Sequence, residues 1–193
     1  MVFFISIMLA YLIGSFSFAI IVAKLMHFPD PRTIGSRNPG TTNMLRVAGK
    51  QAALYVLLGD ALKGLTAVFI ARFLGVYGIS LAFVALVVII GHIFPLYFKF
   101  KGGKGIATIL GAFLGLSFWI DLFLIATWLT IAYLFRYSSV AALVSVTAAP
   151  IYMIIGAHTD YFLPASLIAI LVIWKHWENI QRLRKGNERK IQF

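Results

Sequence analysis

Long apolar segments with few charges are the feature that most restricts how this chain can fold. Hydrophobic residues make up 61% of its 193 residues and charged residues only 12%, against roughly 25% charged in a typical soluble domain. A soluble fold of this length could not bury so much apolar surface. The composition therefore predicts an integral membrane protein built from several transmembrane helices.

Seven segments are expected to cross the bilayer as helices. The longer ones reach the ~20 residues needed for a core about 30 Å thick. The first has no basic region or small-residue cleavage site, so we expect a retained span and not a removed signal peptide. The seven predicted spans are about 2–23, 51–71, 79–98, 105–120, 122–135, 138–157 and 161–177.

The stretch 105–135 can be divided in two ways, because Asp121 lies near its centre. One continuous helix would be about 46 Å long, at ~1.5 Å per residue. Two helices would each be about 22 Å long and would require local thinning of the bilayer. The distribution of charge favours two helices, because a single helix would place the basic C-terminal cluster outside.

The net charge of +11 would suggest nucleic acid in a soluble protein. Here the basic residues lie between apolar runs, so they indicate topology or sites for anionic lipid and substrate, with no nucleic-acid partner. With the N-terminus outside and seven spans, every Lys and Arg except Lys63 and Arg72 falls on the cytoplasmic side. We therefore predict an all-α membrane protein with a cytoplasmic C-terminus and a single domain over 1–193.

The segment 24–50 is the longest predicted loop, and a long loop in a compact protein is usually functional. Its small hydroxyl and amide residues on a Gly/Pro turn could donate several hydrogen bonds to one anion, and Arg46 could add a bidentate contact. The alternative is an N-capped turn that leads into a short interfacial helix. The candidate residues of this turn are Gly35, Ser36, Thr41 and Asn43.

A glycine-rich segment, Lys99 to Gly105, directly precedes the apolar run from Ile106. Glycines let backbone N–H groups approach an anion, and the following helix presents its positive dipole end there. The spacing is not that of a Walker A loop, so ATP is not implied. A flexible turn with snorkelling lysines is the alternative. The candidate residues are Gly102, Gly103, Lys104 and Gly105.

Two further groups of polar residues lie within or near predicted spans. Asp60 and Lys63 are three residues apart and share a helix face. Ionisable residues in a span usually face a cavity or a partner, and a structural ion pair is the alternative here. His92 stands close to Pro95, and a lone histidine near a helix end is more often structural than catalytic.

His176 and Asn179 are three residues apart at the cytoplasmic end of the last span. An imidazole and an amide on one face can orient a hydroxyl and receive a proton. An amphipathic helix end with snorkelling basic residues is the alternative. This segment, the 24–50 loop and the glycine-rich segment all fall on the predicted cytoplasmic face, which favours one site for a phosphorylated substrate.

Several common chemistries are excluded by missing motifs. The chain has no cysteine, so disulfides and thiolate metal sites are ruled out. It lacks the H-x-x-x-x-D pattern of acyl-CoA acyltransferases, a metal-binding H-E-x-x-H or paired-Asp pattern, and a G-x-S-x-G nucleophile elbow. No metal and no cofactor are therefore expected.

Five segments in order resemble the membrane acyl-phosphate:glycerol-3-phosphate acyltransferases of bacteria, and the resemblance covers essentially the whole chain. The departures from the family pattern are Arg37 in place of Gly, Thr41 in place of Ala and Lys175 in place of Arg. Arg37 affects the expected geometry of the local turn. The five segments are Gly35 to Asn43, Asp60 to Gly64, Gly91 to Pro95, Phe100 to Thr108 and His176 to Glu188.

The resemblance implies transfer of a fatty acyl group from acyl phosphate to the sn-1 hydroxyl of glycerol 3-phosphate. The products would be lysophosphatidic acid and phosphate, formed for phospholipid biosynthesis at the cytoplasmic face of the bacterial inner membrane. Expected partners are the two substrates, membrane lipid and an upstream enzyme that forms acyl phosphate. An acyl phosphate is a mixed anhydride with a good leaving group, so neither CoA nor a metal is required.

The resemblance also assigns roles to residues. The family's essential serine and arginine correspond to Ser36 and Arg46, and its glycine-rich motif binds glycerol phosphate. Its third motif supplies His176 and Asn179, with Glu188 or Glu178 in a structural role. The proton acceptor stays open between His176 and a phosphate oxygen of the substrate. The predicted catalytic residues are Ser36, Arg46, Lys104, His176 and Asn179, and the predicted substrate-binding residues are Gly35, Thr41, Asn43, Asp60, Lys63, His92, Gly102, Gly103 and Gly105.

Two alternatives come from other functional classes. A small transporter or channel for an anionic metabolite would also use glycine-broken spans and midplane charges such as Asp60 and Lys63. It predicts functional charges on both sides of the bilayer, whereas this sequence places them on one side. A lipid-binding scaffold that uses the basic tail leaves the glycines 102–105 unexplained.

Overall fold

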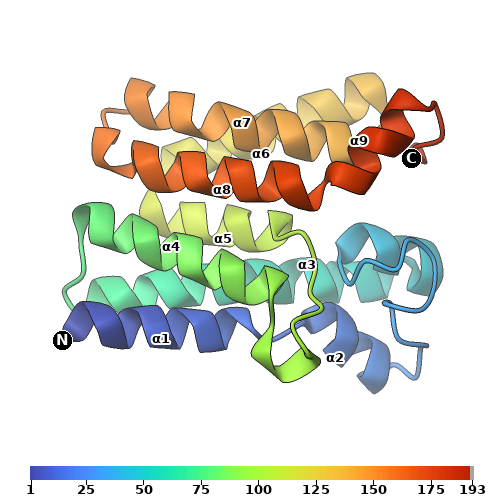
Figure 1. The fold of residues 1–193 in the computed structure, drawn as a ribbon, viewed down its shortest axis with the longest axis horizontal. Helices are drawn as coiled ribbons and strands as arrows, with labels where there is room; N and C mark the ends of the chain where they lie inside the picture. The colour runs from blue at the N-terminus through green and yellow to red at the C-terminus, as the bar shows by residue number, and fades with distance from the viewer. Residues whose placement is uncertain (192–193) are drawn as a thin grey trace. The chain divides into compact units, whose positions relative to one another are not determined.

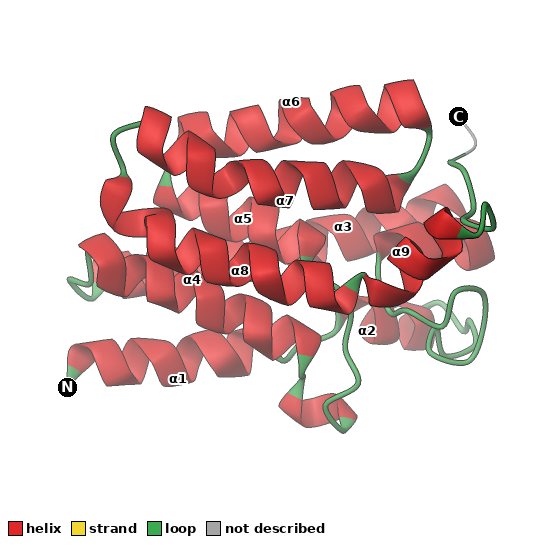
Figure 2. Cartoon of the chain, turned by 45° about the horizontal axis from the view of Figure 1, so that its top comes forward, coloured by secondary structure: helices red, strands yellow, loops and turns green. Residues whose placement is uncertain are grey.

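The computed structural model describes residues 1–191, which form helices, turns and loops without a strand. Figure 2 shows this all-helical content. The chain divides into two compact units, Met1–Leu116 (unit 1) and Ser117–Phe193 (unit 2). Each unit is described by itself.

Unit 1 contains five α-helices and a short 3-10 helix (Figure 1). The first apolar segment is interrupted at residues 15–17, so it forms two helices in place of the one predicted span. In Figure 1, α1 and α4 lie side by side. The elements are α1 (Val2–Gly14), α2 (Phe18–Leu25), α3 (Thr41–Phe73), α4 (Gly78–Ile93), η1 (Leu96–Phe98) and α5 (Ile106–Leu116).

Small residues set the closest helix contacts of unit 1. Where α3 meets α5, a Cβ on Gly111 would overlap the backbone of Ala61, and a Cβ on Gly64 would overlap the backbone of Thr108. Membrane helices associate through van der Waals packing, and small residues let their backbones approach closely. This packing brings the start of α5, with the glycine-rich segment before it, against α3.

Unit 2 contains three long helices, a 3-10 turn and a short terminal helix. The helix α7 packs against both α6 and α8, as Figure 1 shows. The short α9 follows α8 directly, with His176 as the residue between them. The elements are α6 (Phe118–Phe135), α7 (Ser138–Ile155), η2 (Thr159–Tyr161), α8 (Phe162–Lys175) and α9 (Trp177–Arg184).

Five helical segments of the described chain are long and apolar enough to cross a membrane by length and composition. Two other apolar helices, α5 with 11 residues and α8 with 14 residues, are shorter. At ~1.5 Å per residue they extend only about 16 and 21 Å. The five longer segments are Val2–Leu25, Thr41–Phe73, Gly78–Phe98, Phe118–Phe135 and Ser138–Ile155.

Two sequence expectations about helix boundaries need correction. The stretch 105–135 does form two helices, but they are separated at Ser117 and not at Asp121. Ser117 has extended backbone angles (φ −158°, ψ 117°), and its carbonyl accepts a hydrogen bond from the Asp121 N–H at 3.1 Å. Asp121 is therefore a buried residue in the first turn of α6. Serine is a favoured residue at this position before a helix, which explains the boundary.

The second correction concerns the predicted 24–50 loop. Only residues 26–40 are non-helical between α2 and α3, because α3 begins at Thr41. Gly49 interrupts the helical backbone angles of α3 (φ 85°, ψ −177°), so residues 41–48 form a separate short helix of about two turns before the long span. The structure thus has a turn that leads into a short helix, but the N-cap residue Gly40 makes no side-chain capping hydrogen bond, and the anion site at this turn stays a prediction.

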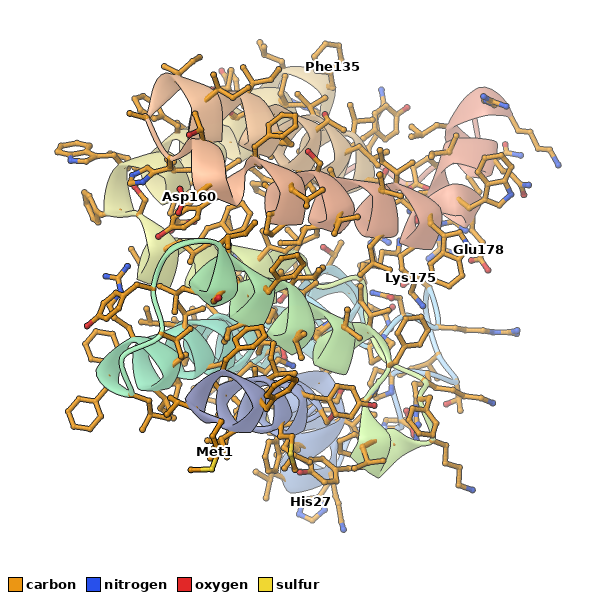
Figure 3. All side chains as sticks on the ribbon, turned by 60° about the vertical axis from the view of Figure 1, so that its left-hand side comes forward. Met1, His27, Phe135, Asp160, Lys175 and Glu178 are labelled. Carbon is orange, nitrogen blue, oxygen red and sulfur yellow. The ribbon has the colours of Figure 1, made fainter. Side chains whose placement is uncertain are left out.

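Basic residues gather at one end of each unit. In unit 1 that end carries the 26–40 loop and the segment before α5, whereas Arg72 lies at the other end and donates to the Leu116 carbonyl at 3.2 Å. In unit 2, Figure 3 shows Asp160 at the opposite end from Lys175 and Glu178. The predicted site residues of each unit lie at its basic end.

Candidate functional site

Asn43 shapes the loop that carries Ser36. Its side-chain oxygen accepts a hydrogen bond from the Ser36 N–H at 2.8 Å, and its amide nitrogen donates to the Pro31 and Ile34 carbonyls at 2.9 and 3.2 Å. Asn43 is 1% exposed, whereas Ser36 is exposed. The side chain of Asn43 thus holds the turn from inside and presents Ser36 at the surface of the loop.

The turn around Ser36 uses left-handed backbone conformations on both sides of the serine. Gly35 has φ +64°, and a Cβ there would overlap the side chain of Asn43. Arg37 has φ 59°, a conformation that is uncommon for a residue with a side chain. The resemblance leads us to expect glycine at the position of Arg37, and glycine adopts such a conformation without steric cost. In this chain Arg37 adopts it with a side chain.

Arg32 forms an ion pair within the same loop and also connects this loop to the segment before the glycine-rich sequence. Asp30 and Arg32 approach within 2.7 Å, and the Arg32 guanidinium also donates to the Phe98 carbonyl of η1 at 3.2 Å. The hydrogen bond from Arg32 lowers the pKa of Asp30 below its usual value. This pair was not among the predicted site residues, because neither residue belongs to one of the five matching segments.

The glycine-rich segment lies between the end of α4 and the serine loop. The Gly102 N–H donates to the Ile93 carbonyl at 3.2 Å, and the Phe100 N–H donates to the Pro95 carbonyl at 2.9 Å. A Cβ on Gly103 would meet His92 Nε2 and would lie 2.7 Å from the Pro39 carbonyl oxygen. Three predicted site segments, distant in sequence, therefore meet at Gly103.

Two other residues of this segment lead into α5. Gly105 has φ +85°, a conformation that glycine adopts without steric cost, and its carbonyl accepts the hydrogen bond from the Ile109 N–H at 2.8 Å. Lys104 is half-buried between Gly103 and Gly105. Its charge lies close to the N-terminus of α5, where the helix dipole also favours an anion.

Asp60, Lys63 and His92 form a buried network inside unit 1. Lys63 Nζ lies 2.8 Å from Asp60 Oδ1, 2.9 Å from His92 Nδ1 and 2.5 Å from the Phe16 carbonyl. Thr108 Oγ1 lies 3.1 Å from His92 Nδ1. All four of these polar side chains are at most 5% exposed. Thr108, from the start of α5, was not among the predicted site residues although the fourth matching segment contains it.

Glu188 is the centre of the polar contacts at the basic end of unit 2. It accepts hydrogen bonds from Ser139 at 2.8 Å, Asn179 at 2.6 Å and Arg182 at 2.7 Å. Burial alone would raise the pKa of Glu188, but these three donors outweigh it and hold the pKa below its usual value. Glu178, with a side chain 84% exposed, is only 3.6 Å from Arg182.

Of the two candidate carboxylates, Glu188 and not Glu178 therefore connects α9 to α7. Ser139 was not predicted as a site residue, because its segment carries no recognisable pattern.

His176 is buried at the junction of α8 and α9, with an exposed fraction of 2%. Its Nδ1 lies 2.9 Å from the Val172 carbonyl oxygen. A carbonyl can only accept a hydrogen bond, so Nδ1 must carry the hydrogen. In the neutral ring the lone pair then resides on Nε2, the nitrogen suited to receive a proton.

The remaining predicted residues of unit 1 lie around the same end of that unit. Thr41 is the first residue of α3 and is half-buried, and Arg46 is exposed on the following turn. Unit 1 thus brings together the serine loop, the glycine-rich segment and the Asp60–Lys63–His92 network. Unit 2 by itself brings His176 and Asn179 to one helix junction.

Comparison with known proteins shows the family to which the chain belongs. The family described as glycerol-3-phosphate acyltransferase matches residues 4–186. A glycerol-3-phosphate acyltransferase of Coxiella burnetii (strain Dugway 5J108-111) is 69% identical over 193 residues, which cover 100% of both chains. One from Legionella pneumophila subsp. pneumophila (strain Philadelphia 1) is 46% identical over 188 residues, which cover 97% of this chain and 68% of that protein.

Two crystal structures of PlsY (YgiH), an integral membrane glycerol 3-phosphate acyltransferase, also match. The glycerol 3-phosphate form has a TM-score of 0.93 and 35% identity, covering 98% of this chain and 96% of that one. The lysophosphatidic acid form has a TM-score of 0.91 and 35% identity, covering 98% and 95%. The matches cover all five segments that carry the sequence resemblance, and the chain belongs to the glycerol-3-phosphate acyltransferase family of integral membrane proteins.

Proposed function

We propose that this multi-pass membrane protein transfers a fatty acyl group from acyl phosphate to the sn-1 hydroxyl of glycerol 3-phosphate. The products are lysophosphatidic acid and inorganic phosphate. Family membership supports the acceptor and the reaction class. The observation that carries the proposal is the meeting at Gly103 of the glycine-rich segment, the serine loop and His92.

In unit 1, the proposed phosphate-binding groups are backbone N–H groups of the glycine-rich segment with the charge of Lys104. Glycines 102 and 103 are packed so closely against α4 and Pro39 that no side chain fits. Their backbone is therefore fixed in place before a ligand binds, which lowers the entropic cost of binding an anion. Ser36 and Arg46 are proposed to hold the acyl phosphate and to stabilise charge on its departing phosphate.

In unit 2, His176 and Asn179 are proposed to orient the glycerol hydroxyl. The hydrogen on His176 Nδ1 is committed to the Val172 carbonyl, so Nε2 is the proposed acceptor of the hydroxyl proton. Asn179 donates to Glu188, which fixes the plane of its amide. Glu188 therefore acts through Asn179 as a positioning residue.

The proposed chemistry is direct acyl transfer. The glycerol oxygen forms a bond to the acyl carbonyl carbon, the C–O bond to phosphate breaks, and the bonding pair leaves with the phosphate. The hydroxyl proton passes to His176 Nε2 and then to the phosphate. Because the acyl phosphate is already an activated anhydride, neither a covalent acyl-enzyme nor a cofactor is needed.

We further propose that α5 and α8 also cross the membrane, giving seven spans in one transmembrane acyltransferase domain over 1–193. The N-terminus is then outside and the C-terminus cytoplasmic, with the basic end of each unit facing the cytoplasm. The proposed location is the bacterial inner membrane. There the acyl chain remains in lipid while glycerol 3-phosphate arrives from the cytosol, downstream of an enzyme that forms acyl phosphate.

Purified protein incubated with acyl phosphate and glycerol 3-phosphate tests the proposal. Release of phosphate and formation of lysophosphatidic acid, each dependent on both substrates, are expected. Acyl-CoA in place of acyl phosphate should give no product. Transport of glycerol 3-phosphate into proteoliposomes without acyl transfer would instead establish a transporter.

A further inference from the structure

We propose that His92 is a positioning residue that holds the glycine-rich segment in place, and that Lys63 and Asp60 fix its tautomer. The proposal rests on the acyltransferase function proposed above. It gives the buried network a role other than contact with a substrate phosphate.

The contacts of Lys63 show why it does not need a substrate partner. An ammonium group has three hydrogens to donate, and the structure places one ion-pair partner, one carbonyl oxygen and one ring nitrogen around Nζ. They are Asp60 Oδ1 at 2.8 Å, the Phe16 carbonyl at 2.5 Å and His92 Nδ1 at 2.9 Å. Phe16 lies in the break between α1 and α2, so Lys63 also binds a carbonyl that this break leaves outside a helix.

These contacts determine the state of the His92 ring. His92 Nδ1 also lies 3.1 Å from Thr108 Oγ1 and 3.5 Å from Asp60 Oδ1. The contact with Lys63 is the shortest of the three, and an ammonium group can only donate, so beside a charged lysine the hydrogen of the neutral ring lies on Nε2. Asp60, at 2.8 Å from Nζ, favours the charged lysine that makes this donation. The tautomer of His92 is thus opposite to that of His176, whose Nδ1 carries the hydrogen.

Nε2 is the part of the ring that faces the glycine-rich segment. A Cβ added to Gly103 would overlap His92 Nε2 and would lie 2.7 Å from the Pro39 carbonyl oxygen. The backbone at Gly103 is therefore held between the ring and the serine loop. Gly102 is fixed on the same helix end, where its N–H donates to the Ile93 carbonyl at 3.2 Å.

The position of the phosphate-binding backbone accordingly depends on a side chain that does not touch the phosphate. Loss of the ring would remove one of the contacts that hold Gly103 and would misplace the N–H groups of the glycine-rich segment. A small misplacement of binding groups is sufficient to weaken a bound anion strongly. The acyl phosphate contacts assigned to Ser36 and Arg46 lie on the serine loop and on the first turns of α3, and they should be affected less.

The tautomer is tested directly by ¹⁵N NMR of histidine-labelled protein in micelles, with the His92 signals identified by their absence in His92→Gln. The expected spectrum shows an unprotonated Nδ1 and a protonated Nε2 for His92. In Lys63→Met this preference should be lost. A hydrogen on Nδ1 of His92 in the wild-type protein would overturn the assignment whatever the activity.

The kinetic test compares His92→Ala, His92→Gln and Lys63→Met. For His92→Ala we expect the KM for glycerol 3-phosphate to rise about tenfold or more, while the KM for acyl phosphate changes less than about twofold. Glutamine extends its amide to the region of Nε2, so His92→Gln should recover most of the loss. Lys63→Met should show the same split as His92→Ala, and the double variant should be no worse than either single one.

Lys50→Met, on an exposed residue of α3, serves as the control for removing a lysine charge and should match the wild type. Equal changes in both Michaelis constants, or a loss confined to kcat, would refute a positioning role in folded protein. A wild-type enzyme without acyltransferase activity would instead refute the proposed function, and the NMR result would still decide the tautomer.

Discussion

Glu188→Gln removes one negative charge from the best-connected carboxylate in unit 2 while keeping its shape. The carboxylate accepts hydrogen bonds from Ser139, Asn179 and Arg182 at 2.6–2.8 Å. The glutamine oxygen can still accept from two of these donors. Its NH₂ group must then face the Arg182 Nε–H, so two hydrogen-bond donors point at each other and the Arg182 hydrogen bond is lost.

The size of the loss follows from these contacts. A hydrogen bond to a charged group contributes about 1.5–3 kcal/mol, and the Arg182 bond belongs at the lower end because its side chain is 40% exposed. The Ser139 and Asn179 bonds change from a charged to a neutral acceptor and lose about 0.5–1 kcal/mol each. We expect the free energy of unfolding to fall by about 3 kcal/mol, or about 6–12 °C in thermal midpoint.

Thermal unfolding in detergent, followed by tryptophan fluorescence, measures this change. Glu178→Gln is the matched control, because Glu178 is 84% exposed and 3.6 Å from the same arginine. It should cost about 0.5 kcal/mol or less. If the two variants unfolded at the same temperature, the assignment of Glu188 as the structural carboxylate would be wrong.

The stability difference should also depend on pH. The folded-state pKa of Glu188 is held below its usual value, so its stabilisation is present above the unfolded pKa of about 4.3. It is lost as the pH falls through the lower folded pKa. The gap between wild type and Glu188→Gln should therefore be full at pH 7 and narrow in acid. A gap that widened in acid would contradict this sign.

Three further results are expected. Gly103→Ala should raise the KM for glycerol 3-phosphate more than the KM for acyl phosphate, because the new methyl group displaces the backbone held against Pro39. Initial-rate kinetics measure both KM values, with Gly156→Ala, at the end of unit 2 away from its basic residues, as the control. Ser36→Ala should lose most of the acyltransferase activity. Mass spectrometry of the wild-type enzyme incubated with acyl phosphate alone should nevertheless find no acyl group on Ser36, and an adduct formed and discharged at the turnover rate would disprove direct transfer. Single cysteines at positions 138 and 159, on a chain without cysteine, should be labelled from opposite sides of the membrane, and labelling from the same side would exclude the proposed span count.

The helices themselves were largely predictable from the sequence, because apolar length and charge position are local properties. The division of 105–135 into two helices followed from the basic C-terminal cluster. The boundary at Ser117 did not, since Asp121 was the more conspicuous polar residue. Its burial in α6 depends on packing that no local pattern records.

The five polar segments were also recognised from sequence, and the comparisons confirm the family that they indicated. The roles within them were harder to separate. Asn43 and Lys63 were predicted to bind substrate, and this stays a prediction; the structure adds that their polar atoms contact protein groups from distant parts of unit 1. A residue type suited to an anion is equally suited to a backbone carbonyl, and only the neighbours distinguish the two.

The sequence by itself determined the membrane class and the family, because composition and ordered motifs carry that information along the chain. Tertiary structure alone decided which groups meet. Gly103 lies against His92 and Pro39 in a unit whose helices pack at small residues, α3 on α5 and α1 on α4, and Glu188 reaches Ser139 because the C-terminal segment folds back on α7. Such contacts join residues many positions apart, and their energies depend on distance and burial, which spacing along the chain does not specify.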